Sequence, residues 1–219
     1  MLPMARTGLF LIALVCASAG LGAFERALDA RSLSEAIDTG QSRLGAARAR
    51  FHAAYHVVVT QSPVDYLEVV TPFRRVALDA EAHANAGDRL YGQREARALL
   101  GDDPSRVDIV IELTFHPMNN FIGVPGYSVN LLSMPGGEPI LASQISRIPR
   151  FGPRLSGMPL PYPYTVGSPA LNGSQPLLGG SLVATFDGQA LDPQGTYPIV
   201  ISDSGKELAR ARVDFSKLR

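Results

Sequence analysis

The fold is decided by one stretch of the chain, Val107-Asp108-Ile109-Val110-Ile111-Glu112-Leu113-Thr114-Phe115-His116. All five odd-numbered positions are apolar, and four of the five even-numbered positions are polar. This period of two indicates a β-strand with one face in a core and the other near water. The odd-numbered side chains are therefore expected in the core: Ile109, Ile111, Leu113 and Phe115. The polar ones are expected outside it: Asp108, Glu112 and Thr114.

A second strand is expected shortly after the first. Pro117 has no amide hydrogen to donate to a ladder, so the first strand should end there. Alternation resumes at Tyr127, and the two strands are predicted to form a central hairpin. Their ten-residue connection, 117–126, contains Phe121 and Ile122. These two residues either form a binding loop or plug the end of the fold.

The rest of the second half predicts further strands, Leu182 to Phe186, Thr196 to Ser202 and Leu208 to Phe215. Pro198 indicates an edge strand or the start of a strand. Short strands, turn signals and no intervening helix are typical of an antiparallel β-sandwich, immunoglobulin-like in architecture only. No motif that defines a family is present.

The first half alternates helix and strand. A helix is predicted within 24–50, where Ser32 and Glu35 have the spacing of a capping box and Gly40 favours a break. Its apolar stripe is Leu33, Ile37, Leu44 and Phe51. Strands Tyr55 to Thr60 and Tyr66 to Val70 follow, then helices beginning at Thr71-Pro72 and at Gln93.

The predicted fold class is therefore α+β. The expected divisions are a signal peptide (1–23), a helical and mixed part (24–103) and the sandwich part (104–219), with the last two expected to form one compact unit.

The N-terminus has the pattern of a bacterial export signal. Arg6 gives a positive start, 8–15 is apolar, and Ala17-Ser18-Ala19 fits the small-x-small cleavage pattern. Cleavage after Ala23 is an alternative. The apolar run is shorter than the roughly 20 residues that a membrane-spanning helix needs. We therefore expect a periplasmic or secreted protein.

Cys16 is the sole cysteine and lies inside this segment. Cleavage beyond it leaves a mature chain without thiol chemistry. The alternative is a lipoprotein, cut before Cys16 and anchored to the membrane by acylation of that residue. The preceding Val15 fits such a site poorly.

The charge is balanced, with 20 acidic and 20 basic residues, which gives no electrostatic footprint for nucleic acid. Two of the 20 basic residues are lysines, Lys206 and Lys217, so 18 are arginines. We interpret this excess as codon bias of a GC-rich genome, and not as an arginine-based site.

The passage Pro149 to Pro176 holds seven prolines interleaved with tyrosines. It is either a proline-aromatic surface that grips a partner or a long loop packed over the sheet. The glycine pairs Gly136-Gly137 and Gly179-Gly180 are interpreted as turns between strands.

Signals for chemistry are weak. His52 and His56 are four residues apart and could share a metal, but no H-E-x-x-H pattern is present. His116 follows Asp108 and Glu112 on one face of the strand, an arrangement that could serve acid–base catalysis. Solvated polar residues explain the same pattern, so no catalytic, cofactor or metal residue is assigned.

Two functions follow from the sequence. The favoured one is an exported, non-enzymatic envelope protein, structural or protein-binding, with an unidentified protein or envelope partner. The alternative is a hydrolase or metal-dependent enzyme that uses His116 with Asp108 or Glu112, or the His52/His56 pair.

Overall fold

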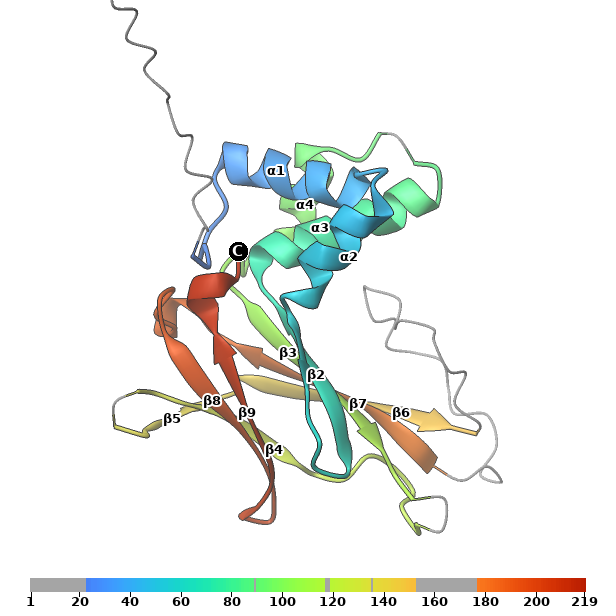
Figure 1. Ribbon diagram of the computed structural model, residues 1–219, viewed down its shortest axis with the longest axis vertical. Coiled ribbons are helices and arrows are strands. Elements are labelled where there is room, and N and C mark those ends of the chain that lie inside the picture. The colour runs from blue at the N-terminus through green and yellow to red at the C-terminus, as the bar shows by residue number, and fades with distance from the viewer. Residues whose placement is uncertain (1–22, 89, 117–118, 135, 153–176) are drawn as a thin grey trace, which may run out of the picture.

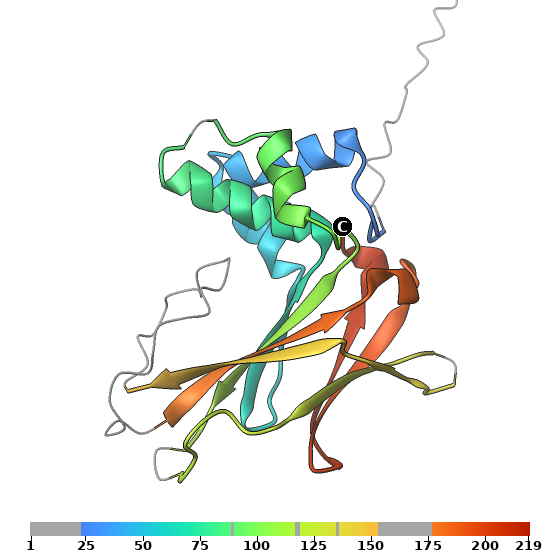
Figure 2. The ribbon, with the colours of Figure 1, turned by 180° about the vertical axis from the view of Figure 1, so that it is seen from behind.

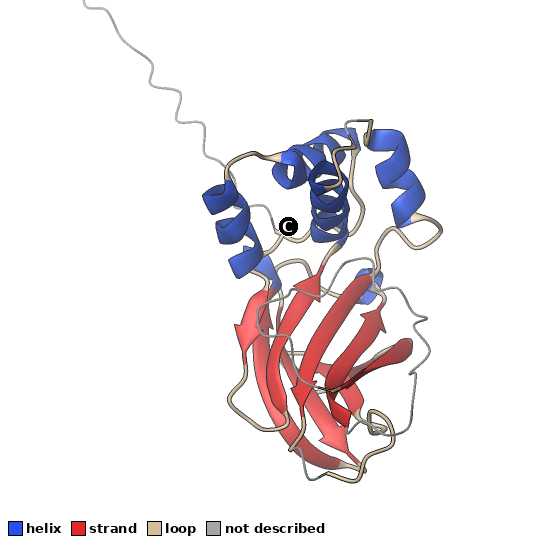
Figure 3. Cartoon of the chain, turned by 90° about the vertical axis from the view of Figure 1, so that its right-hand side faces the viewer, coloured by secondary structure: helices blue, strands red, loops and turns tan. Residues whose placement is uncertain are grey.

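Helices and strands occupy opposite ends of the molecule (Figures 1 and 3). The computed structural model describes residues 23–219, apart from 89, 117–118, 135 and 153–176. Its α-helices are α1 (Ala30–Gln41), α2 (Gly45–Ala53), α3 (Pro72–Asn85) and α4 (Gln93–Leu100). No helix among these described residues is long and apolar enough to cross a membrane.

The strands form two antiparallel sheets. The five-stranded sheet has the order β1-β2-β3-β7-β6, and the four-stranded sheet has the order β5-β4-β8-β9. The strands are β1 (His56–Val58), β2 (Val64–Val70), β3 (Val107–Thr114), β4 (Ser128–Leu132), β5 (Pro139–Leu141), β6 (Gln144–Phe151), β7 (Leu177–Phe186), β8 (Thr196–Asp203) and β9 (Lys206–Asp214). Two 3-10 turns, η1 (Gly188–Ala190) and η2 (Phe215–Lys217), follow β7 and β9. The α+β class with an antiparallel sandwich is confirmed.

The strand β3 lies at the centre of the five-stranded sheet, between β2 and β7. The predicted central hairpin is wrong, because β4 belongs to the other sheet. The connection after β3 instead crosses the gap of about 10 Å that separates packed sheets. Since β1 and β2 precede residue 104 and pair into the same sheet, that sheet takes strands from both halves of the chain.

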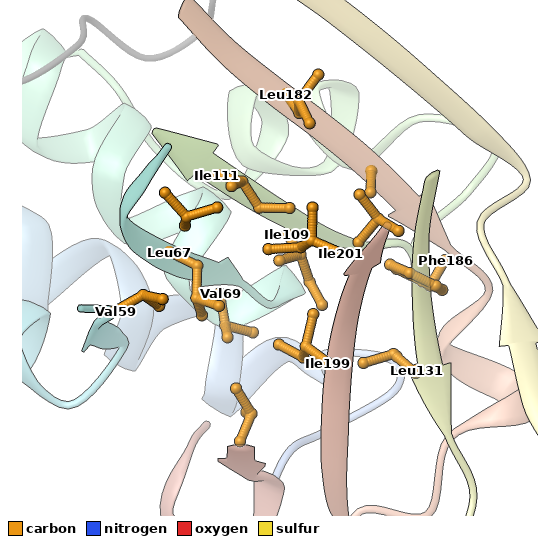
Figure 4. Close-up of a cluster of buried hydrophobic side chains, with 14 of the residues drawn as sticks. Val59, Leu67, Val69, Ile109, Ile111, Leu131, Leu182, Phe186, Ile199 and Ile201 are labelled. Carbon is orange, nitrogen blue, oxygen red and sulfur yellow. The ribbon is translucent and has the colours of Figure 1, made fainter. Parts of the chain in front are cut away.

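The core lies between the two sheets (Figure 4). Ile109, Ile111 and Leu113 are fully buried and Phe115 is 5% exposed, so the predicted inward face of β3 is confirmed. Ile199 and Ile201 of β8 enter the same cluster from the opposite sheet. Leu33, Ile37, Phe73 and Val76 belong to a second cluster among the helices.

The helices begin and end largely as expected. Thr71 caps α3 by accepting the amide of Arg74, and Pro72 lies in the first turn. The predicted capping box at Ser32 is wrong, because Asp29 caps α1 and accepts the Ser32 amide at 2.7 Å. The Asp29 carboxylate lies one turn earlier and leaves Ser32 inside the helix.

The loop between α1 and α2 departs from the predicted apolar stripe. Leu44 is 70% exposed there, because α1 ends at Gln41 and α2 starts in a new direction (Figure 2). Gly40 precedes this end, as predicted, and also lets α1 approach α3. A Cβ atom at position 40 would clash with the Ala77 carbonyl oxygen.

Two predictions in the second half need correction, and the structure decides between the two alternatives for Pro198. Pro149 belongs to β6, a strand that the sequence pattern did not predict, while 153–176 of the proline-rich passage lies outside the described residues. Gly179 and Gly180 lie inside β7 and not in a turn. Pro198 lies in β8, an interior strand, near its start. It is accommodated because the pairing of β8 with β4 begins at Ile199, beyond the proline.

Candidate functional site

The polar side of β3 was the sequence's strongest candidate for chemistry, and the structure buries it. Asp108 and Glu112 are each 3% exposed, whereas both were predicted to lie outside the core. Thr114, at the end of the strand, is partly exposed. Buried carboxylates must be paired to be tolerated. Their partners therefore decide what this face of the sheet can do.

Glu112 is held by an arginine from the edge strand. Arg150 of β6 forms an ion pair with Glu112 Oε1 and donates from Nη2 to the Leu113 carbonyl oxygen at 2.9 Å. The Ser181 hydroxyl of β7 donates to Glu112 Oε2 at 2.8 Å. Both carboxylate oxygens therefore accept hydrogen bonds, one of them from a cation. These side-chain contacts link the three neighbouring strands β3, β7 and β6.

A glycine makes the ion pair possible. Gly179 lies between Thr114 on β3 and Arg150 on β6 in the strand register. A Cβ atom at position 179 would clash with the Arg150 guanidinium and the Leu113 carbonyl. A strand glycine often marks such a close approach. The missing side chain of Gly179 therefore leaves the space in which the Arg150 side chain passes over β7.

Asp108 forms a second cluster at the end of β3 near the helices. Its Oδ2 atom accepts from Arg106 Nε at 3.1 Å, and its Oδ1 atom accepts from the Thr185 hydroxyl at 2.7 Å. Arg75 of α3 lies 3.6 Å from Asp108 and donates to the Arg106 carbonyl at 2.6 Å. Arg75 is 2% exposed, so its contacts with Asp108 and Arg106 form a buried link between the helices and the sheet.

His116 lies beyond the end of β3, and its side chain is exposed. Its carbonyl oxygen accepts from Asn119 Nδ2 at 2.6 Å. The hydrogen-bond donors placed on the two carboxylates are arginine, serine and threonine side chains. A carboxylate whose oxygens already accept such bonds is poorly placed to act as a general base.

The two histidines of the other candidate site lie on different elements and face different carboxylates. His52 on α2 hydrogen-bonds Glu81 at 2.8 Å, and His56 on β1 lies 3.5 Å from Glu68. Glu81 also pairs with Arg48 at 3.1 Å, so it fastens α2 onto α3. In the parts of the chain that the structure describes, no three histidine, cysteine or acidic residues gather as a metal site.

The connection from β3 to β4 lies at the end of the sandwich away from the helices (Figure 1). It carries two exposed apolar residues, Phe121 and Ile122. Its base is fixed, because Asn119 donates to the Leu177 carbonyl at 2.8 Å and the Phe121 ring packs on Phe115 at 5.0 Å. Ile122 follows and is 99% exposed. The sequence left two interpretations of this loop, a binding loop or a plug at the end of the fold. Ile122 does not act as a plug, because its side chain is exposed.

At the opposite end, Arg219 joins the helices to the sandwich. The Tyr55 hydroxyl donates to the Arg219 carbonyl at 3.0 Å, and the Thr71 hydroxyl donates to the same oxygen. The Arg219 guanidinium lies over the Phe73 ring at 4.5 Å and donates to Glu35 at 2.6 Å. Burial raises the pKa of Tyr55 above its usual value of 10.0.

Comparison with known proteins adds no relative: no family model, curated protein or solved structure matches this chain. The residues that sequence reasoning missed are the partners of the carboxylates, chiefly Arg75, Arg106 and Arg150. Arginine abundance was interpreted as codon bias, yet these three arginines pair with buried acids. One available signal was Val110, an apolar residue among the polar positions of β3, which is 2% exposed.

Proposed function

We propose that this protein is an exported, non-enzymatic protein of the bacterial envelope that acts as a structural or protein-binding module. The observation that carries the proposal is the β3–β4 connection, where a fully exposed Ile122 follows a base fixed by Asn119 and Phe121. Loops that are positioned by a rigid scaffold commonly carry binding. A single exposed apolar residue is ordinary by itself; its fixed base gives it a defined position for a partner.

The strand edges favour the loop over strand addition as the binding element. An open edge pairs readily with another chain unless it is short, charged or interrupted by proline. The edge strands β1 and β5 have three residues each, and β6 carries Pro149. On β9, the Arg210 amide already donates to the Gln61 side chain at 2.8 Å. Each edge therefore carries a feature that discourages pairing.

The alternative function, a hydrolase or metal-dependent enzyme, has less support. Asp108 and Glu112 are engaged by arginine, serine and threonine, and His52 and His56 face separate acids. The first pair is better explained as a structural network that holds the sheet and helices together.

The location in the proposal rests on the sequence of residues 1–23. The expected compartment is the periplasm or the medium, with a lipid anchor on Cys16 as the alternative. The partner is an unidentified protein or envelope component, and the balanced charge gives no reason to propose nucleic acid.

Site-specific photocrosslinking tests the binding loop. A photoreactive amino acid replaces Ile122 in one sample and Leu90, 89% exposed in the helical half, in the control. We expect a discrete adduct from position 122 in exporting cells. Excess wild-type protein should compete with this adduct in cell extracts, whereas excess Ile122→Asp protein should not. Identical adducts from both positions, or equal competition by the two proteins, would refute the loop as a binding element.

A further inference from the structure

The outer side of the four-stranded sheet carries apolar residues at positions that face away from the core. Leu131, Ile140 and Ile199 point into the core, so their neighbours along β4, β5 and β8 face outward. These outward residues, none of them charged, are Ser128, Asn130, Leu132, Pro139, Leu141, Thr196, Pro198, Val200 and Ser202. An antiparallel sheet usually presents polar side chains on its solvated side. The described helices lie at one end of the sandwich and leave this face open (Figures 1 and 3).

One row of side chains on this face is fixed by the strand register. Leu141 of β5, Asn130 of β4 and Val200 of β8 lie side by side, and Arg210 of β9 follows at the edge. Leu141 is 68% exposed, and the other two members of β4 and β8 are partly exposed. The Arg210 guanidinium is paired with Glu207 at 2.6 Å. The middle of the face is therefore uncharged, as the centres of protein interfaces usually are.

Asn130 occupies the middle of this row. Within the part of the chain that the structure describes, its side-chain amide makes no hydrogen bond. In a twofold contact, a residue close to the axis meets its own copy. A charged side chain would repel its copy there, whereas an amide carries both a donor and an acceptor and can pair with itself. A lipid acyl chain would leave the same amide buried without a partner, which is unfavourable.

We propose that the outer face of the four-stranded sheet is a twofold interface between two copies of this chain, with the axis running along β4. Asn130 then meets its own copy, and Val200 faces Leu141 of the second copy. Arg210 and Arg212 of β9 lie at the rim and stay in water. A different protein is a poorer match, because an uncharged face has no charge pattern with which to select one.

The size of the face predicts the strength of the association. Four strands about 4.8 Å apart and about six residues long cover about 20 by 20 Å, or roughly 400 Å² per copy. The total of roughly 800 Å² lies below the approximately 1,200–2,000 Å² of stable interfaces. We therefore expect a weak dimer that forms at high protein concentration and dissociates on dilution.

Sedimentation velocity of the full chain at low to high micromolar concentrations tests the proposal. Wild type should shift from monomer towards dimer as its concentration rises. Asn130→Asp places two carboxylates at the axis, and like charges in an interface should raise the concentration needed for association by about tenfold or more. Asn120→Asp, at an exposed position in the β3–β4 connection, is the matched control and should associate as wild type does. A monomeric wild type, or an Asn130→Asp protein that associates like wild type, overturns the proposal.

Leu141→Asp and Leu44→Asp form a second matched pair, because the two leucines are 68% and 70% exposed. Leu141→Asp alone should weaken the association, and equal behaviour of the two variants would place the contact elsewhere and overturn the proposal. Flotation with phosphatidylglycerol vesicles tests a lipid surface as the other occupant. A wild type that stays monomeric and binds these vesicles, with binding lost in Leu141→Asp, would assign the face to lipid instead. These measurements leave Ile122 unchanged, so their outcome is independent of the proposed binding loop.

Discussion

The Arg150 guanidinium crosses the backbone of Gly179 to pair with Glu112, and this contact makes the outer side of β3 part of the folded interior. The Glu112 side chain is 4% exposed and that of Arg150 is 23% exposed. A pair that is this unevenly buried costs more when its buried member loses its partner than when its surface member does. The pair therefore makes stability depend on residues from three strands.

Truncation of Arg150 should show how strongly the stability of the fold depends on this ion pair. Arg150→Ala leaves a buried carboxylate with Ser181 as its remaining described side-chain donor, and we expect a loss of about 3–5 kcal/mol, the usual range for a broken buried pair. Urea melts of the purified variant give the value. Glu138→Ala, at an exposed position, should stay within about 0.5 kcal/mol. If Arg150→Ala matched that control, the ion pair would contribute nothing to stability.

Gly179→Ala tests the gap through which the arginine passes. The added methyl group would clash with the guanidinium and a strand carbonyl, so the loss should be at least the roughly 1–3 kcal/mol typical of overpacking. Gly126→Ala is the matched control, because a Cβ atom there meets open space. Combining Gly179→Ala with Arg150→Ala should cost less than the sum of the two, since both disrupt one contact. Additive losses would show that Gly179 acts independently of Arg150.

The sequence predicted the inward side of β3 because core burial there follows from a local pattern, the alternation of Ile109, Ile111 and Leu113. It did not predict burial of Asp108 and Glu112, because all their partners except Arg106 come from distant positions: residues 75, 150, 181 and 185. No local period reports such pairing. Val110 did carry a signal, since an apolar residue on an exposed strand face is out of place there.

The two glycine pairs also show that a local sequence pattern does not report contacts with distant residues. Gly136-Gly137 lies in a turn with positive φ at both residues, as predicted from the pair itself. Gly179-Gly180 has the same composition and lies in a strand, where Arg150 and the Ile148 carbonyl require the space. A turn depends on the residues that form it and can be predicted from them. A glycine that is needed because another strand packs closely against it depends on residues elsewhere in the sequence. The edge strand β6 was also not predicted, and its Pro149 was assigned to the proline-rich passage instead.

Phe115 links the core to the proposed binding loop. Its side chain is 5% exposed, whereas Phe121, packed against it, is 40% exposed. Phe115→Ala should therefore cost about 3–5 kcal/mol, the range for a buried aromatic. Phe121→Ala should cost clearly less and should weaken the crosslink from position 122, because the base of the loop loses its ring contact. Paired urea melts give the ranking, and a Phe121 variant as unstable as the Phe115 variant would show that Phe121 is a core residue.

Tyr55 should make the junction between helices and sandwich sensitive to alkali. Burial raises its pKa above 10.0, because the phenolate would lose its hydration among Arg219, Thr71 and the core. In the unfolded chain the phenol ionises near pH 10, while in the folded protein it stays neutral to higher pH. The unfolded state therefore releases protons first, and the free energy of unfolding should fall as the pH rises above about 10.

Tyr55→Phe removes the titrating group and two hydrogen bonds with Arg219. The variant should be less stable than wild type at neutral pH, by about 1 kcal/mol for each lost hydrogen bond. Its stability should fall less steeply than that of wild type between about pH 9 and pH 11, because no phenol at position 55 can ionise. Tyr66→Phe, at a partly exposed site, is the control for general alkaline effects. Urea melts at each pH measure both slopes, and parallel slopes for wild type and Tyr55→Phe would mean that the buried hydroxyl does not set the alkaline limit.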